Sequence, residues 1–227
     1  MQVNLVNENS VIIYFSDTVC AETTDKITHA CQLFRSELSD TLLDIVPSYN
    51  SILLSCNLRK TGLQNFVINI RQILNELDNV GLTNLVRNKI VLPVYYGQEV
   101  ALDHRDVSLH TGLAFSEIVK LHTEECYRVF AIGFTPGFAF LGNTPKEMTI
   151  PRKASPRLNV PKGSVAIADR QTAIYPSQSP GGWQVIGRTP VDLLDDSEEC
   201  LSKFAMGDEV HFESIDKQTF LAMGGQL

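Results

Sequence analysis

Three arginines in the second half of the chain stand directly after proline or glycine. Arg152 and Arg157 each follow a proline in the stretch PRKASPRLNVPKG, and Arg188 follows a glycine. Proline fixes its own φ angle and restricts the residue before it, so these guanidinium groups project from a stiffened backbone. A preorganised guanidinium can bind a carboxylate or phosphate through two parallel hydrogen bonds. We therefore expect an anion site. The alternative is that these arginines have a structural role: they would cap the ends of a β-barrel or pair with acids of the N-terminal domain, both of which are predicted below.

Aromatic residues set among glycines and prolines accompany the arginines. Phe134 and Phe138 lie in GFTPGFAFLG, and Trp183, the only tryptophan of the chain, lies in SQSPGGWQVIGRTP. This composition suits an apolar pocket wall that the backbone approaches closely. Gln171 and Tyr175 of RQTAIYP add neutral hydrogen-bonding groups that can orient a ligand. The sequence thus predicts one aromatic-lined hollow onto which the three arginines converge.

The charge distribution also indicates an anion. Between Cys126 and Val191 eight Lys and Arg residues accompany only two acids, so this segment carries +6 in a chain of net charge -7. A cationic stretch in an acidic protein suggests a small anionic ligand; the alternative is a chance fluctuation on a solvated surface. The overall negative charge argues against nucleic acid as a partner.

Other kinds of site find little support. His122 and Cys126 lie four residues apart on an expected helix, but two ligands do not make a zinc site, and we predict no metal. The chain contains no Gly-x-Ser-x-Gly motif and no convincing Ser, His, Asp set. Covalent catalysis therefore has no visible nucleophile.

Cysteine usage and hydropathy indicate a cytoplasmic protein. The five cysteines, among them Cys200, form no CxxC pair, and their odd number is typical of reduced thiols. The apolar runs are far shorter than the ~18 residues of a membrane-spanning helix. No secretory signal is visible at the N-terminus.

The first part of the chain, residues 1–90, is expected to form a small α/β domain. VIIYFS reads as a strand, residues 24–38 have helical apolar spacing, and LLDIVPSYNSILLSC reads as two strands around a turn. A second helix is expected over residues 63–78, with Gly81 shortly after its end. KIVLPVYYG closes the series as a strand. The predicted order is βαββαβ, with helices on one side of the sheet.

Residues 91–227 are expected to form a second domain rich in strands. Two helical patterns, HRDVSLHTG and SEIVKLHTEE with Ser116 as its N-cap, precede many brief apolar runs broken by Gly and Pro. Such runs at close spacing indicate an all-β barrel or sandwich. The fold class is therefore α+β, with a domain boundary near residue 90.

Three stretches of the second domain together resemble a known family. They are HTEECYRVFAIGFTPGFAFLG, PRKASPRLNVPKGSVAIADRQTAIYPSQSPGGWQVIGRTP and FAMGDEVHF. They resemble the B subunit of bacterial 5-oxoprolinase, whose family is also called the KipI-like or allophanate hydrolase subunit 1 family. The match covers most of residues 92–212, and the same unit is similar to half of the carboxyltransferase domain of urea carboxylase. The resemblance implies that the second domain is a cyclophilin-like β-barrel.

The resemblance also implies an enzyme that is active only in a complex. The chain would pair directly with the C subunit of 5-oxoprolinase and work with the A subunit, opening 5-oxo-L-proline to L-glutamate with ATP, which is held by this chain or by a partner. ATP would phosphorylate the amide oxygen, and water would then attack the activated carbon. The implied substrate is a small anion carrying a lactam.

The resemblance assigns roles to the residues singled out above. The arginines would bind carboxylate or phosphate and stabilise developing negative charge, and the histidine would carry a proton. These implied catalytic residues are Arg152, Arg157, Arg188 and His122. Neutral groups would orient the lactam, and aromatic rings would form the wall. These implied substrate-binding residues are Gln171, Tyr175, Phe134, Phe138 and Trp183.

Two alternatives belong to other functional classes. One is a regulatory binding protein that inhibits a sensor histidine kinase, but it gives no reason for three rigidly held arginines beside an aromatic wall. The other is a component of a urea or allophanate pathway, which would require a biotin carrier that this chain lacks. A prolyl isomerase is disfavoured because barrel shape alone does not confer function. Asp169 and Ala173 depart from the family pattern, which has glycine at these positions, and an inward carboxylate there would weaken an anion site.

Overall fold

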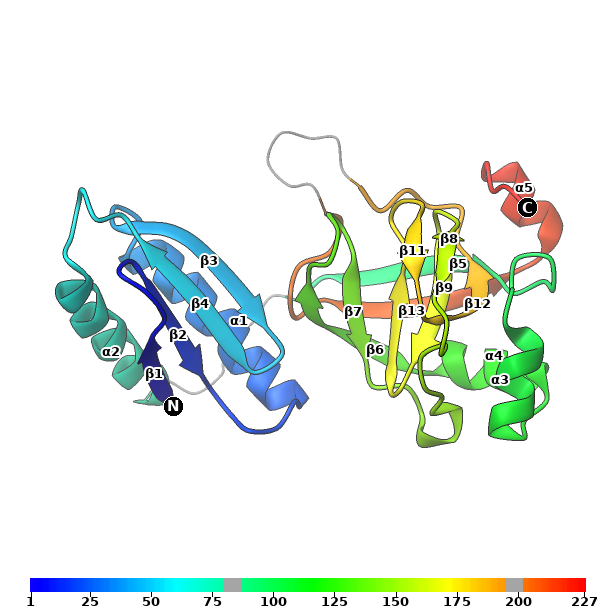
Figure 1. Cartoon of the computed structure of the whole chain (residues 1–227), viewed down its shortest axis with the longest axis horizontal. Helices are drawn as coiled ribbons and strands as arrows, with labels where there is room; N and C mark the ends of the chain where they lie inside the picture. Colours follow the sequence, from blue (N-terminus) through cyan, green and yellow to red (C-terminus); the bar gives the residue numbers. More distant parts are fainter. Residues whose placement is uncertain (80–86, 195–201) are drawn as a thin grey trace. The chain divides into compact units, whose positions relative to one another are not determined.

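The structure is a computed structural model of the chain that describes residues 1–79, 87–194 and 202–227 (Figure 1). The chain divides into two compact units, Met1–Arg87 and Asn88–Leu227. The general prediction, an α/β unit followed by a β-barrel, is confirmed. Gly81 and Cys200 lie outside the described residues. No helix in the described ranges combines the length and the apolar character needed to cross a membrane.

The first unit is a four-stranded antiparallel sheet in the order β1-β2-β4-β3, packed against two helices. Its elements are β1 Gln2–Leu5, β2 Ser10–Tyr14, α1 Ala21–Glu37, β3 Leu42–Ser48, β4 Ser51–Cys56 and α2 Leu63–Asn79. The buried face of α1 includes Ile27, Ala30, Cys31 and Phe34, which recur at the three- and four-residue spacing of a helix. The periodicity on which this helix was predicted therefore matches its packing.

The order of elements in this unit differs from the prediction in two places. The chain begins with the short strand β1, whose four residues carry too little alternation to be noticed, so the order is ββαββα. The strand expected to close the unit, β5 Lys89–Tyr95, belongs instead to the barrel of the second unit. Its main partner is a strand more than a hundred residues later, which local sequence does not reveal.

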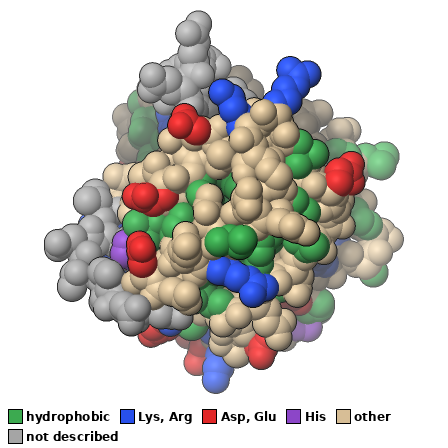
Figure 2. All heavy atoms as spheres, turned by 90° about the vertical axis from the view of Figure 1, so that its left-hand side faces the viewer, with side chains coloured by type: hydrophobic (Ala, Val, Ile, Leu, Met, Phe, Trp, Pro, Cys, Tyr) green, Lys and Arg blue, Asp and Glu red, His purple; other side chains and the backbone are tan. Residues whose placement is uncertain are grey.

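A groove of about 420 Å³ lies between the edge strand β1 and helix α2. It is lined by Val3, Leu5, Leu63, Gln64, Val67, Ile68 and Arg71. Figure 2 views the molecule from the left-hand side of Figure 1 and shows hydrophobic side chains at the surface in the middle of that face.

The second unit is built on a closed barrel of seven strands in the order β10-β7-β6-β13-β5-β12-β9. Besides β5, these strands are β6 Cys126–Ile132, β7 Ala139–Gly142, β9 Ser164–Ala168, β10 Gln171–Ile174, β12 Gln184–Arg188 and β13 Glu209–Ile215. β5 and β13 run parallel from Lys89↔Glu209 to Tyr95↔Ile215, whereas the other neighbours are antiparallel. A separate hairpin of β8 Arg157–Val160 and β11 Ser179–Gly181 accompanies the barrel.

Side chains of the barrel strands alternate between two apolar clusters. Val165 and Ile167 of β9 belong to the main core inside the barrel. Ala166 and Ala168 belong to a second cluster, which the period of two puts on the outer face. The small alanines leave room there for large rings, and the outer cluster also contains Phe138, Val160, Ala173, Tyr175, Trp183 and Val185.

Short helices complete the second unit: α3 His104–Thr111, α4 Phe115–Glu124 and α5 Lys217–Ala222, with a 3-10 turn at Lys146–Met148. Both predicted helical patterns are confirmed. The predicted N-cap of α4 is wrong, because the helix begins before Ser116. Ala114 is the N-cap residue, and the Glu117 carboxylate accepts a hydrogen bond from its backbone N–H at 2.8 Å.

Candidate functional site

The main candidate site is a cavity of about 420 Å³ in the second unit, bordered by the outer cluster. Its wall consists largely of aromatic rings, namely Phe134, Phe138, Phe140, Tyr175 and Trp183. Pro156, Pro180, Gly181 and Gly182 complete the lining, together with one charged residue, Arg152. This is the aromatic-lined hollow that the sequence predicted, with a single guanidinium in its wall.

The rings of the wall hold one another in tilted and edge-to-face contacts. Phe138 contacts Tyr175 and Trp183 with ring centroids 5.4 and 6.1 Å apart. Phe134 lies 5.4 Å from Phe138 and is 68% exposed, so it forms the outer rim. Its φ of 70° is a strained conformation for a bulky residue, which costs roughly 1–2 kcal/mol. Edge-to-face contacts of this kind favour a rigid wall.

A close approach of backbone to ring explains one glycine of the SPGGW stretch. A Cβ on Gly181 would lie 2.2 Å from the hydroxyl oxygen of Tyr175, a buried residue. At Gly182 the nearest atom, Cγ of Pro156, would be 3.6 Å away, which is ordinary contact. Only the first of the two glycines is therefore required by packing.

Arg152 faces the cavity from a segment without regular secondary structure. Its guanidinium carbon lies 5.6 Å from the ring centroid of Trp183, within the range of a cation–π contact. No ion pair to Arg152 is found among the described residues, and the residue is exposed to solvent. Its charge is therefore available to an anionic ligand.

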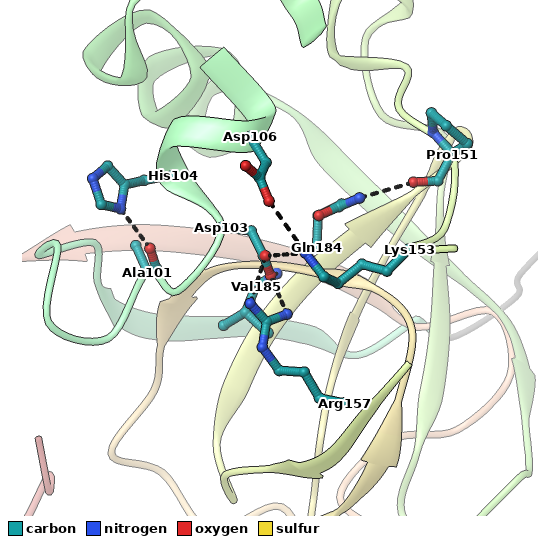
Figure 3. A network of polar contacts seen from close by, with 9 residues as sticks. All are labelled: Ala101, Asp103, His104, Asp106, Pro151, Lys153, Arg157, Gln184 and Val185. Atoms are coloured by element: carbon teal, nitrogen blue, oxygen red, sulfur yellow. Dashed lines mark hydrogen bonds and ion pairs between the residues drawn. The ribbon is translucent and has the colours of Figure 1, made fainter. Parts of the chain in front are cut away.

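Arg157, five residues later, is engaged by the protein itself (Figure 3). Its Nη1 and Nη2 atoms donate to the two carboxylate oxygens of Asp103 at 2.7 and 2.6 Å. Lys153 donates to the same carboxylate at 2.7 Å, and so does the backbone N–H of Val185. Burial acts to raise the pKa of Asp103, but these hydrogen bonds outweigh it and hold the pKa below its ordinary value. The structure therefore gives no support to Arg157 as a substrate-binding residue: its guanidinium holds a buried carboxylate and is not part of the cavity lining.

Arg188 lies at a different cavity, of about 210 Å³, and not in the aromatic one. Its guanidinium donates to the backbone carbonyls of Lys162 and Gln226, each at 2.8 Å. It therefore supports the chain near the C-terminal residues. The predicted convergence of the three arginines is wrong, and only Arg152 reaches the aromatic wall.

His122 is a core residue on α4 with no exposed surface. Its Nδ1 lies 2.8 Å from the Tyr96 hydroxyl, and its Nε2 lies 2.9 Å from the hydroxyl oxygen of Thr172. That hydroxyl donates its hydrogen to the Ala166 carbonyl at 3.2 Å, so it accepts from Nε2–H, and Nδ1 accepts from Tyr96. Burial lowers the pKa of His122 to about 3. The structure therefore gives no support to a proton carrier: the imidazole is neutral and lines none of the cavities described for residues 1–79, 87–194 and 202–227.

The remaining predicted residues divide in the same way. Tyr175 lines the cavity, whereas Gln171 begins β10, pairs with Gly142 and Ala168, and is not part of the lining. Asp169 adopts φ 53°, which explains why glycine suits this position, and it lies exposed in the turn outside the cavity lining. Its carboxylate therefore does not oppose an anion at Arg152.

Two residues of the site were not predicted. Phe140 lines the wall beside Phe138. The two residues are two positions apart, which puts both side chains on one side of a strand, and this spacing could have predicted Phe140. Asp103 has no comparable signal, because its partners lie about fifty residues away in the sequence. The alternative expected the arginines to pair with acids of the first domain. Arg157 does pair with an acid, but this acid, Asp103, belongs to the second unit.

Comparisons with known proteins identify the family. Residues 1–203 match the family model described as carboxyltransferase domain, subdomain C and D. The chain is 31% identical over 230 residues to the B subunit of 5-oxoprolinase from Bacillus subtilis, with 97% of this chain and 95% of the relative covered.

Solved structures agree. The crystal structure of TTHA0988 superposes with a TM-score of 0.78 at 30% identity, over 91% of this chain and 40% of that longer chain. The urea carboxylase of Kluyveromyces lactis superposes with a TM-score of 0.73 over 97% of this chain and 22% of its own, and at 12% identity this likeness concerns the fold alone. The chain therefore belongs to the carboxyltransferase subdomain C and D family, the family that includes the B subunit of 5-oxoprolinase.

Proposed function

We propose that this chain is the B subunit of an ATP-dependent 5-oxoprolinase, which opens 5-oxo-L-proline to L-glutamate in a complex with other subunits. The names of three relatives, 31–43% identical, support this proposal over a kinase inhibitor or a urea-pathway component. The observation that carries it is the aromatic cavity with Arg152 in its wall.

The cavity suits the chemistry of this substrate. 5-Oxoproline is a small lactam ring with one carboxylate, and the cavity offers ring faces with one guanidinium that no protein carboxylate neutralises in the described part of the chain. The lactam ring packs against Phe138 and Trp183, and Arg152 pairs with the carboxylate through charge-assisted hydrogen bonds. Such a site binds and orients the substrate.

ATP is assigned to another subunit of the complex. A triphosphate needs several donors and cations, and the lining of the aromatic cavity provides one cation beside apolar rings. These residues do not fit ATP. The chain contributes the substrate-binding wall, and the steps that use ATP belong to the assembled enzyme.

The partners we propose are the C subunit of 5-oxoprolinase, in direct contact, and the A subunit. The TTHA0988 chain and the urea carboxylase chain both contain this unit as a minor part of a longer polypeptide. A unit that recurs beside other domains is expected to work together with them. We expect this unit to meet the corresponding domains in the cytoplasm.

The test is reconstitution. We expect the chain co-expressed with candidate A and C subunits to form glutamate and ADP from 5-oxoproline. Arg152→Ala should raise the KM for 5-oxoproline at least tenfold, which corresponds to about 1.4 kcal/mol of lost substrate binding.

The matched control is Arg105→Ala, which removes an exposed arginine of α3 from the same unit and should leave KM unchanged. Absence of turnover by an intact wild-type complex would overturn the proposed function. Equal KM values for the two variants would remove Arg152 from the site.

A further inference from the structure

We propose that Asp103 is the positioning residue of the aromatic cavity, holding the segment that carries Arg152 against the strand that follows Trp183. This inference rests on the proposed function, because it concerns the geometry of the same substrate-binding wall. It assigns a functional role to a carboxylate that does not touch the cavity.

The side chain of Asp103 makes different hydrogen bonds from those expected at its position in the fold. It is the N-cap residue of α3, where an Asp side chain commonly accepts a hydrogen bond from its own helix, but here it makes no such bond. Its side chain is fully buried, and its oxygens accept from Lys153, Arg157 and the backbone of Val185. One carboxylate thus joins α3, β12 and the segment before β8 (Figure 3).

The segment that carries Arg152 depends on these contacts because it has no sheet or helix of its own. Before Arg152, the Pro151 carbonyl accepts from the Gln184 amide at 3.1 Å. After it, the Lys153 backbone N–H donates to the Gly182 carbonyl at 2.7 Å. These two bonds join the segment to the residues on either side of Trp183. The Lys153 and Arg157 side chains then tie it to Asp103.

The charges around the Asp103 carboxylate explain why its loss would change the position of Arg152. Lys153 and Arg157 are mostly buried, with 20% and 25% of their side chains exposed. Asp106 supplies a second, more distant carboxylate, 3.2 Å from the Lys153 ammonium and 64% exposed. Without Asp103, two partly buried cations would lack their main partner, and relaxing them toward water would pull the segment from the wall.

The experiment compares Asp103→Asn with wild type in the complex with the A and C subunits. The variant keeps the shape of the side chain but removes its charge. We expect KM for 5-oxoproline to rise about tenfold with a smaller change in kcat, because modest misplacement of a binding group weakens substrate binding. Trp183 is the single tryptophan of the chain, so its fluorescence in the isolated chain reads the wall directly. We expect acrylamide to quench it more strongly in the variant than in wild type.

The matched control is Glu147→Gln, which replaces an exposed acid of the same unit by its amide. It should change neither KM nor quenching. A purely structural role for Asp103 would lower Tm while leaving KM and the quenching of the folded protein unchanged, and that result overturns the inference.

A second variant keeps the test decisive if Asp103→Asn does not fold. Lys153→Met removes one arm of the network and leaves the Arg157–Asp103 pair in place. It should shift KM and Trp183 quenching in the same direction by a smaller factor, and wild-type values of both would overturn the inference. If the wild-type complex shows no turnover, the proposed function is overturned. The positioning role of Asp103 is still tested by the quenching of Trp183 in the isolated chain.

Discussion

Two aromatic clusters lie on opposite faces of the same barrel wall. Inside, His122 stacks on Phe212 at 4.4 Å, and both its ring nitrogens have partners. Outside, Trp183 and its neighbours border a cavity of about 420 Å³ with Arg152 as the one charged residue of the lining. Thr172 and Ala173, adjacent in β10, face these two environments in turn.

This contrast shows how to separate a core from a binding site when both contain rings and ionisable groups. In the inner cluster, both ring nitrogens of the imidazole have hydrogen-bond partners within the protein. A buried network whose donors and acceptors are all paired has no group left to bind a ligand. The outer cluster holds its rings rigidly but leaves space and a charge without a carboxylate partner in the described chain. A charged group without an ion-pair partner, next to a rigid wall and an open cavity, is therefore the better indicator of a binding site.

The strongest test of this comparison is His122→Ala. We expect the free energy of unfolding to fall by about 4 kcal/mol, because a cavity opens and the hydroxyls of Tyr96 and Thr172 lose their partner. Urea denaturation measures this change. The KM of the folded complex should stay at the wild-type value, and a large loss of kcat in a protein of undiminished stability would return His122 to the catalytic residues.

Gly181→Ala addresses the outer cluster. The new methyl group would displace Tyr175 from the wall, so we expect destabilisation by about 1–3 kcal/mol and a clear rise in KM for 5-oxoproline. Gly182→Ala is the matched control for stability, since its methyl group meets only ordinary contacts. If both variants behave alike in thermal unfolding, the close approach of Gly181 to Tyr175 does not shape the wall.

Over a single pH unit, the smallest expected effect is a pH dependence of the inner cluster. Burial lowers the pKa of His122 from 6.5 to about 3, so below pH 6.5 the unfolded chain takes up a proton that the folded chain does not. Stability from this group is therefore complete above pH 6.5 and is lost toward pH 3, at up to about 1.4 kcal/mol per pH unit.

The measurement is the difference in unfolding free energy between wild type and His122→Ala, followed from neutral pH downward. This difference should shrink as the pH falls. A constant difference would mean that the folded protein protonates His122 as readily as the unfolded chain does.

Local patterns were sufficient for much of the fold and for the wall of the site. Helical spacing predicted α1 and α2, and glycine and proline around rings predicted the wall residues Phe134, Phe138 and Trp183. These features are encoded within a few residues of one another. The strand β5 was assigned to the wrong unit because its parallel partner, β13, is distant in the sequence.

The fate of each arginine could not be predicted for the same reason. Arg152 and Arg157 both follow proline and look equivalent in the sequence. Asp103 separates them, since it binds Arg157 across more than fifty residues and leaves Arg152 to the cavity. Similarly, the imidazole of His122 is neutralised by burial between partners from other elements, which no spacing reveals.

The pairing of β5 with β13 has a consequence for synthesis of the protein. The barrel joins the earliest strand of its unit to the latest, so the ring of strands cannot close while the ribosome has yet to release residues 209–215. Until then β5 lacks its main partner, and contacts of such long sequence separation form slowly. The nascent second unit should therefore keep an open sheet edge at β5 until its last strand has been made, whereas the sheet of the first unit can assemble as it leaves the exit tunnel.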